Sequence, residues 1–397
     1  MELSTFQTSP LDNTSSSSAL SLCHTAATLL FLPSVYTLLF LTALPGNALS
    51  LWVFYRCIST ISPTHIYLSH LCISNLLLSF TTPFLAAYYA QGSIWTLRGI
   101  LCQLVLHGIT PVLHINIYIS LMILTWVALS RFATLIRHTH ASRPSICTML
   151  LPHGFYTCLT RTSFASRVCS AVWVFAVGGI VPVTVYYSVN EAAAAADKDG
   201  EVKKGGVEVC YNPAVELGGS LSAAFTVPVI TMFFVFYLLV LLSYLTVLRH
   251  IERSRRSTKV TTSQSLLGRV LRNIVVIQGV LSVCLLPYHI FKPIFISLAH
   301  DQRQATLSPG PNHCHPLSTF VELKNCLLLL AALRGSTDPL MYFLLDKTFR
   351  HQTLKLLRCK RNDPSRQMCW SVTGSANQNA GQSGDGHVTT ATVRKTE

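Results

Sequence analysis

Three ionisable side chains lie inside segments that are otherwise apolar and helix-forming. His289 and Lys292 follow Pro287 on one segment, and Lys324 lies on the next. An ionisable residue in such a segment faces a polar interior or water by default, because lipid does not solvate charge. Ammonium groups without an obvious carboxylate partner favour a ligand that carries a phosphate, sulfate or carboxylate. The pattern therefore predicts a site for an anionic ligand at His289, Lys292 and Lys324.

Two other interpretations of the lysines stay open. A lysine near the end of a membrane helix can reach headgroups or water while its stem stays in the apolar layer. For Lys324, an ion pair with Glu322 would also satisfy the charge. The position of each ammonium group separates these alternatives from a ligand site.

A second pair of charges, Arg334 and Asp338, lies deeper in the segment of Lys324. An unpaired charge at the centre of a membrane helix costs about 2.5–3.5 kcal/mol on insertion scales. Four residues separate the two side chains, and that spacing puts them on the same face of a helix. We expect a buried ion pair that at the least fixes this helix.

The composition places these residues in a membrane. Half of the 397 residues are hydrophobic and only 12% are charged, whereas soluble proteins carry about 25%. The net charge of +14 is spread between apolar segments, which excludes nucleic acid as a partner. No nucleophile–base set marks an enzyme, so no catalytic residue and no cofactor is expected. The tripeptide His313–His315 lacks zinc-ligand spacing, so no metal is expected either.

Seven windows of about 20 or more apolar residues predict membrane-spanning helices. They cover about 27–54, 64–89, 101–132, 167–187, 217–248, 270–298 and 317–345. A short amphipathic segment follows at 347–358, with Phe349 and Leu356 facing lipid. The predicted fold class is an all-α membrane protein, a seven-transmembrane-helix bundle with a short amphipathic eighth helix.

Lys and Arg concentrate in alternate loops and after the last span, which places those regions in the cytoplasm. The tail 1–26 is then extracellular, 27–346 is the transmembrane domain, and the tail 359–397 is cytoplasmic and disordered. Asn13 heads a glycosylation sequon on the outer side. We expect a multi-pass protein of the plasma membrane.

Thirteen cysteines cannot all pair with one another, and four of them fall on the oxidising outer side. We predict two disulfides from these positions, Cys102–Cys210 and Cys23–Cys314, with free thiols as the alternative in each case. Cys359 follows the amphipathic segment and is a candidate for palmitoylation, with an unmodified cytosolic thiol as the alternative.

Individual motifs in the spans point to one family. The first span contains GNALSLWVF, the third ends in ALSRFATL around Arg131, and the seventh ends in DPLMY. Together with Pro287 in the sixth span, these segments resemble rhodopsin-like (class A) G-protein-coupled receptors, over about 27–358. The resemblance implies a heterotrimeric G protein and arrestin as partners. It also implies that Arg131, Pro287 and Tyr342 serve coupling and switching.

The segments PYHIFKPIF and STDPLMYFLLDKTF resemble the purinergic-like branch of that family. Members of this branch bind nucleotides or lysophospholipids, and they hold ligand phosphates at the positions that match Lys292 and Lys324. The resemblance therefore implies an extracellular anionic small molecule or lipid as the ligand.

One departure from the family pattern concerns the centre of the membrane. Asn75 stands where the second span usually carries an acid that binds a sodium ion. We hypothesise that the Arg334 guanidinium takes the role of that ion, contacting Asp338 with Asn75 and Ser120 nearby. The alternative is that Arg334 and Asp338 only fix span seven.

A second departure concerns the cytoplasmic end of span three. Ser130 stands where the family usually carries an acid before Arg131. A serine cannot hold the arginine by charge. The inactive state is therefore expected to be less firmly locked, which would give basal activity.

We expect a receptor that transduces binding of an extracellular anionic ligand, similar to a nucleotide or a lysophospholipid, to a heterotrimeric G protein. One alternative is a receptor-like protein with basal signalling or a partner-subunit role and no diffusible ligand. A transporter is the other alternative, against which the lack of an internal repeat argues.

Overall fold

The computed structural model describes residues 23–93, 108–140, 153–186, 190, 220–256, 261–304 and 315–362. Within these ranges the chain is helical and contains no β-strand. The chain divides into two units, 1–350 and 351–397, and the bundle described below belongs to the first.

Among the described residues, seven helices are long and apolar enough to cross a membrane, as the sequence predicts. They cover Ala27–Cys57, Pro63–Ala90, Pro111–Thr134, Thr162–Tyr186, Ala224–Arg249, Val270–His300 and Ser318–Leu345. We call them spans one to seven. Span four begins earlier than predicted, at Thr162, and the predicted start of span three lies outside the described residues. The predicted fold class is confirmed.

The spans are built from α-helices that are joined in places by π-helical turns of five residues. The elements are η1 (Ala27–Phe31), α1 (Leu32–Trp52), η2 (Val53–Cys57), α2 (Pro63–Ala90), α4 (Thr110–His140), α6 (His153–Leu159), α7 (Thr162–Phe175), η4 (Ala176–Ile180), α10 (Ser220–Arg256), α11 (Thr261–Val280), η5 (Leu281–Leu285), α12 (Leu286–Gln304), α13 (Ser318–Leu345) and α14 (Lys347–Asn362). The amphipathic helix α14 extends four residues beyond its predicted end.

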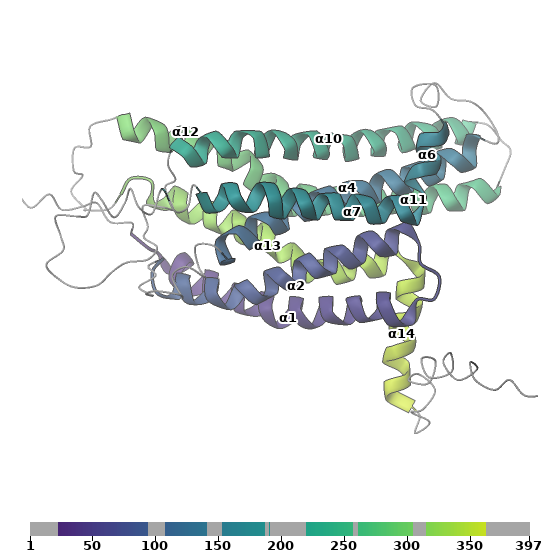
Figure 1. Ribbon diagram of the computed structural model, residues 1–397, viewed down its shortest axis with the longest axis horizontal. Helices are drawn as coiled ribbons and strands as arrows, with labels where there is room; N and C mark the ends of the chain where they lie inside the picture. Colours follow the sequence, from purple (N-terminus) through teal and green to yellow (C-terminus); the bar gives the residue numbers. More distant parts are fainter. Residues whose placement is uncertain are drawn as a thin grey trace, which may run out of the picture. The chain divides into compact units, whose positions relative to one another are not determined.

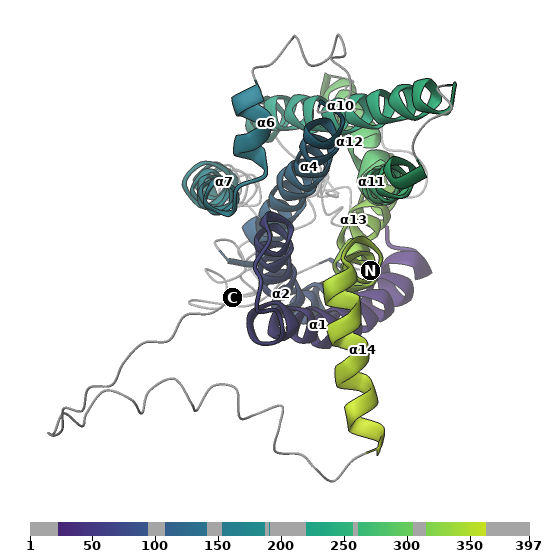
Figure 2. The same ribbon diagram turned by 90° about the vertical axis from the view of Figure 1, so that its right-hand side faces the viewer.

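Span three is the central helix of the bundle. The spans lie side by side in Figure 1, and Figure 2 shows α4 passing between α7 on one side and α11 and α13 on the other. α4 contacts α2, α7, α10, α11 and α13, and 78% of its apolar window is buried, the largest share among the seven spans. Residues of α4 therefore lie within reach of most other spans.

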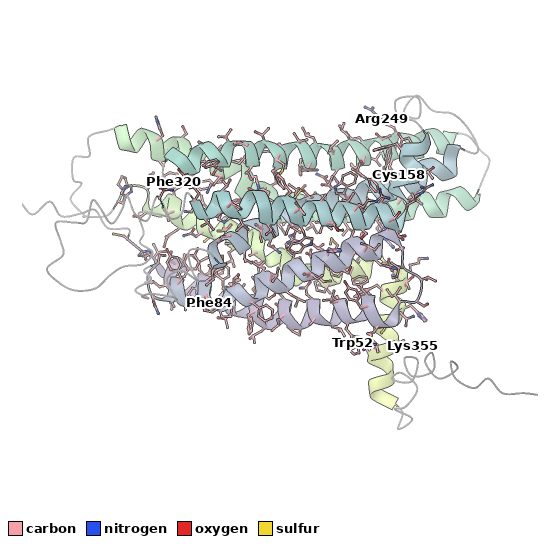
Figure 3. The ribbon with its side chains drawn as sticks, viewed as in Figure 1. Trp52, Phe84, Cys158, Arg249, Phe320 and Lys355 are labelled. Atoms are coloured by element: carbon pink, nitrogen blue, oxygen red, sulfur yellow. The ribbon has the colours of Figure 1, made fainter. Side chains whose placement is uncertain are left out.

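Large apolar side chains cover the outer surface of the spans. Trp52, Phe84 and Phe320 lie there (Figure 3) and are 44%, 40% and 37% exposed. A water-soluble protein would bury most side chains of this kind. Their exposure suits a surface that meets lipid, in which each helix satisfies its own backbone hydrogen bonds.

Span six departs from α-helical geometry just before Pro287. The π-helical turn η5 ends at Leu285, and α12 begins at Leu286. Proline has no amide hydrogen, and its ring clashes with the carbonyl group four residues earlier, which is that of Val283. A π-helical turn accommodates this defect. The π-helical turn thus lies directly before the proline that requires it.

The two ends of the bundle are marked by different hydrogen bonds. At one end, which we call the Cys23 end, the Cys23 amide donates to the Ser318 hydroxyl at 3.2 Å. There the Glu322 carboxylate accepts from the Thr25 amide and the Thr28 hydroxyl, at 2.7 Å each. The other end, where α13 finishes, is called the Asp346 end.

Candidate functional site

A cavity of about 290 Å³ lies among spans three to six. Its walls are mostly apolar. The polar side chains in the walls are His114 and Tyr118 of span three, Thr184 of span four, Thr226 of span five, and Tyr288 and Lys292 of span six. Among the described residues that line the cavity, Lys292 is the one lysine or arginine. The cavity therefore suits a molecule with an apolar body and an anionic group.

Lys292 is positioned by an aromatic neighbour on its own helix. Its Nζ lies 5.9 Å from the centre of the Tyr288 ring, one turn earlier in α12. An ammonium group over a ring face is attracted by the ring electrons. This contact keeps the charge of Lys292 at the cavity wall, where the sequence analysis expects it.

His289, which is also predicted to bind the ligand, is not among the described residues that line this cavity. Its side chain is fully buried, and its ring stacks on Phe233 with centroids 3.7 Å and planes 7° apart. Its Nδ1 lies 2.8 Å from the carbonyl oxygen of Leu285, and its ring meets Tyr118 edge-on at 5.9 Å. Tyr288 and Lys292, one turn apart, form the face of α12 that lines the cavity, whereas His289 lies on a neighbouring face and packs against Phe233 of span five.

Lys324 is also absent from the lining of this cavity. It projects from span seven, and its Nζ lies 5.2 Å from the centre of the Phe295 ring on span six. The side chain is only 8% exposed, which argues against snorkelling. Lys292 lines the cavity among spans three to six and Lys324 does not. That the two lysines bind one ligand stays a prediction.

Deeper in the membrane, Arg334 is one of the largest fully buried side chains. Its Nη1 lies 2.5 Å from Oδ2 of Asp338. Its Nη2 donates to the side-chain oxygens of Asn116 and Asn75, at 3.0 and 3.3 Å. Three oxygens thus surround a cation that lipid would not solvate. The predicted contacts with Asp338 and Asn75 are present, and their role stays a prediction.

Asn116 is the member of this cluster that the sequence analysis does not single out. It lies one turn from Ser120, the span-three residue that was expected there. Ser120 is fully buried, but its Oγ has no hydrogen-bond partner within the described part of the chain. The longer side chain of Asn116 reaches Arg334, and its Nδ2 donates to Ser74 at 3.0 Å and to Asn75 at 3.2 Å. The sequence signal that could have indicated Asn116 is its polar amide side chain within an apolar span.

Asn75 joins the cluster to spans one and seven. Its Nδ2 lies 2.8 Å from Oδ2 of Asp338, 3.1 Å from Oδ1 of Asn47 and 3.4 Å from the Tyr342 hydroxyl. Asn47 in turn donates to the Gly335 carbonyl at 2.8 Å. Spans one, two, three and seven therefore share one polar network, whose members stabilise one another in a low dielectric.

Tyr342 connects this network with the Asp346 end. Its ring is fully buried and packs edge-on against Phe54 at 5.9 Å and Phe349 at 6.1 Å. Phe349 also stacks on Phe54 at 4.9 Å and is 3% exposed. The expectation that Phe349 faces lipid is therefore wrong, because two aromatic rings of the bundle enclose it.

At the Asp346 end, a carboxylate that sequence analysis does not single out meets two basic side chains. Oδ2 of Asp346 lies 3.0 Å from Nε2 of His65 and 3.8 Å from Nη2 of Arg131. Oδ1 accepts the Phe349 amide at 2.9 Å, which caps the first turn of α14. Burial raises the pKa of Asp346, but His65, the Phe349 amide and Arg131 outweigh burial and lower the pKa overall. The carboxylate is therefore held in its charged form.

Several predicted sites lie outside the described residues. These are Asn13, Cys102, Cys210 and Cys314, together with the side chain of Cys359. Cys23 is disulfide-bonded. None of the other cysteines whose side chains the structure describes is disulfide-bonded. The two predicted pairings and the modifications of Asn13 and Cys359 stay predictions.

Comparison with known proteins agrees with this arrangement of helices. Residues 46–342 match the family model described as "7 transmembrane receptor (rhodopsin family)". The chain is 37% identical over 337 residues to the human protein "Probable G-protein coupled receptor 82", which covers 85% of this chain and 94% of that protein.

More distant relatives cover a similar share of the chain. "Probable G-protein coupled receptor 34" of Pan troglodytes is 27% identical over 339 residues, 84% of this chain and 78% of that protein. The human "Uracil nucleotide/cysteinyl leukotriene receptor" is 26% identical over 333 residues, 83% of this chain and 77% of that protein. The region that matches the family model contains the cavity, the polar network and Arg131.

Proposed function

Because the chain belongs to the rhodopsin family of seven-transmembrane receptors, we propose that it couples an extracellular anionic ligand to a heterotrimeric G protein. The Cys23 end then faces the outside of the cell. The Asp346 end, with Arg131, faces the cytoplasm. The concentration of Lys and Arg in alternate loops supports this orientation.

The cavity beside Lys292 is the main support for an amphiphilic anion as the ligand. Phe175, Ile180, Val183 and Phe225 are among its apolar walls. A lysophospholipid-like amphiphile would bury its chain against these residues and place its anionic group near Lys292. A nucleotide has several phosphates and a polar base, so this mostly apolar cavity satisfies fewer of its polar groups than those of a lysophospholipid.

The name of one relative is consistent with an anionic ligand. It gives a uracil nucleotide and a cysteinyl leukotriene as ligands of that protein. Both classes of molecule are negatively charged. The shared chemistry is thus an anion, and the apolar walls favour an amphiphilic one.

The position of Lys292 on α12 suggests how ligand binding changes the opposite end of span six. A ligand that binds Lys292 and Tyr288 holds α12 close to spans three and five. The π-helical turn η5 separates α12 from α11, so the two halves of span six have different backbone restraints. Binding would then shift the population towards a state in which α11 moves at the Asp346 end.

A ligand screen with matched variants tests this function. Cells that express the full chain are exposed to lysophospholipids of different headgroups and to nucleotides, and activation of a panel of G proteins is measured. Lys292→Gln removes a charged hydrogen-bond donor, so the half-maximal ligand concentration should rise roughly 10- to 100-fold. Lys355→Gln removes an exposed charge on α14 and should leave that concentration unchanged.

Each outcome distinguishes the alternatives. Activation by nucleotides alone would replace the amphiphile with a nucleotide as the ligand. Ligand responses that survive Lys292→Gln would place the anionic group elsewhere. Activation of G proteins without any ligand effect would favour the receptor that signals by basal activity.

A further inference from the structure

The end of α13 is fastened to span six through its last carbonyl groups. The carbonyl oxygen of Leu345 lies 3.3 Å from Nδ2 of Asn273, and that of Leu344 lies 3.5 Å from Nη2 of Arg272. Both donors belong to α11. The last carbonyls of a helix have no partner within it and carry the negative end of its dipole. An amide and a guanidinium group from span six therefore suit this position.

Asp346 adds a full negative charge at the same place. Its Oδ2 faces His65 of α2 and Arg131 of α4, at 3.0 and 3.8 Å. Its side chain is 8% exposed, so water screens these contacts less than at an open surface. The end of span seven thus binds basic or amide side chains from spans two, three and six.

Arg131 has no carboxylate beside it on its own helix. The preceding residue is Ser130, whose carbonyl accepts the Thr134 hydroxyl at 2.9 Å. Within the described part of the chain, Arg131 meets a carboxylate from the far end of another span, that of Asp346. Asp346 therefore occupies the electrostatic role that Ser130 cannot fill.

We propose that Asp346 and the last carbonyls of α13 form an autoinhibitory clamp at the cytoplasmic end of the bundle. Asp346 is the positioning residue that holds Arg131, and Asn273 holds span six to span seven. The inference rests on the proposed function, since the clamp inhibits coupling only if the chain couples to a G protein. The clamp is the alternative to the expectation that Ser130 leaves the inactive state weakly locked.

The variant Asp346→Asn tests the contact with Arg131 without removing the cap of α14. Asparagine caps helices as well as aspartate, so the Phe349 amide keeps an acceptor. The charge that faces Arg131 is lost. Ligand-free nucleotide exchange on G protein, measured with the full-length receptor, should rise roughly fivefold, the range of a partly exposed ion pair.

A second measurement does not depend on any G protein. Genetically encoded spin labels replace Ile61, before α2, and Gly268, on α11, which are both exposed. Double electron–electron resonance then reports the spacing between these positions. Asp346→Asn should populate a second, longer spacing. Asn273→Leu removes a different contact of the clamp and should change the spacing in the same direction, so the test does not depend on one variant.

Rescue and control variants distinguish the clamp from general damage. Adding Ser130→Asp to Asp346→Asn places a carboxylate beside Arg131 again and should lower basal exchange towards the wild-type rate. Glu322→Gln removes a carboxylate at the opposite end of the same helix. It should change neither basal exchange nor the spacing.

Two results decide between the clamp and the proposed coupling. Wild-type spacing and wild-type basal exchange in both Asp346→Asn and Asn273→Leu would overturn the clamp. A longer spacing in both variants, without exchange on any G protein, would support the clamp and refute coupling.

Discussion

The guanidinium of Arg334 and the carboxylate of Asp338 lie one turn apart on α13, 2.5 Å from each other, and neither side chain is exposed. Burying both charges is unfavourable, and their attraction offsets this only while both are present. Asn75 and Asn116 complete the shell around Arg334. The stability of span seven therefore depends on the two charges as a pair.

Arg334→Met is expected to lower the free energy of unfolding by about 3–5 kcal/mol, because it leaves Asp338 buried without its cation. Adding Asp338→Asn should recover most of this loss. Thermal unfolding in detergent of the two single variants and the double variant provides the double-mutant cycle. If the losses of the single variants simply add, the two residues do not act as a pair.

Sodium ions are expected to have no effect on signalling by the wild-type chain. The Arg334 guanidinium already occupies the oxygens of Asp338, Asn75 and Asn116, so a bound cation would be repelled. The measurement compares sodium with N-methylglucamine at constant ionic strength. Arg334→Ser with Asn75→Asp removes the internal cation and adds an acid, and it should introduce sodium dependence. A strong sodium response of the wild type would contradict the hypothesis that Arg334 replaces the ion.

Replacing Gly46 with a larger residue is expected to destabilise the bundle. A Cβ at this position would lie 3.1 Å from Cγ of Pro339 on span seven, so Gly46→Val should cost about 1–3 kcal/mol by overpacking. Gly178→Val is the matched control, because a Cβ there meets nothing within 4 Å. Thermal unfolding in detergent compares the two. Equal loss in both variants would mean that helix propensity, and not the contact with Pro339, is responsible.

His289→Phe is expected to keep both the fold and the ligand response. A phenylalanine ring preserves the stacking on Phe233 and the edge contact with Tyr118, whereas His289→Ala should cost about 3–5 kcal/mol, as for other large buried rings. Surface expression, thermal unfolding and the ligand concentration for half-maximal activation are measured for both. A folded His289→Phe receptor that no longer responds would show that His289 belongs to the ligand site.

Local features of this chain were predictable from sequence because their causes are local. A window of about 20 apolar residues is itself the requirement for crossing a bilayer, so the spans follow from hydropathy. The pairing of Arg334 with Asp338 needs only the geometry of one helix. Both predictions agree with the structure.

Features that join separate spans were not predictable in this way. Asn116 and Asp346 have partners on other helices, and the sequence around each residue does not indicate which residues those partners are. Helical spacing alone does not show that Tyr288 and Lys292, and not His289, form the face of α12 that lines the cavity. The rotation of span seven, which turns Lys324 towards Phe295, likewise depends on packing between helices.

The carboxylate of Asp346 divides its two oxygens between separate partners. Oδ1 holds the amide that starts α14, and Oδ2 faces His65 and Arg131. Starting a helix anew is the slow and unfavourable step of its formation. If Arg131 moves away from Oδ2, the first turn of α14 still has Oδ1 as its acceptor. Return to the inactive state then requires only that the Arg131 side chain contacts Asp346 again, and no helix has to refold.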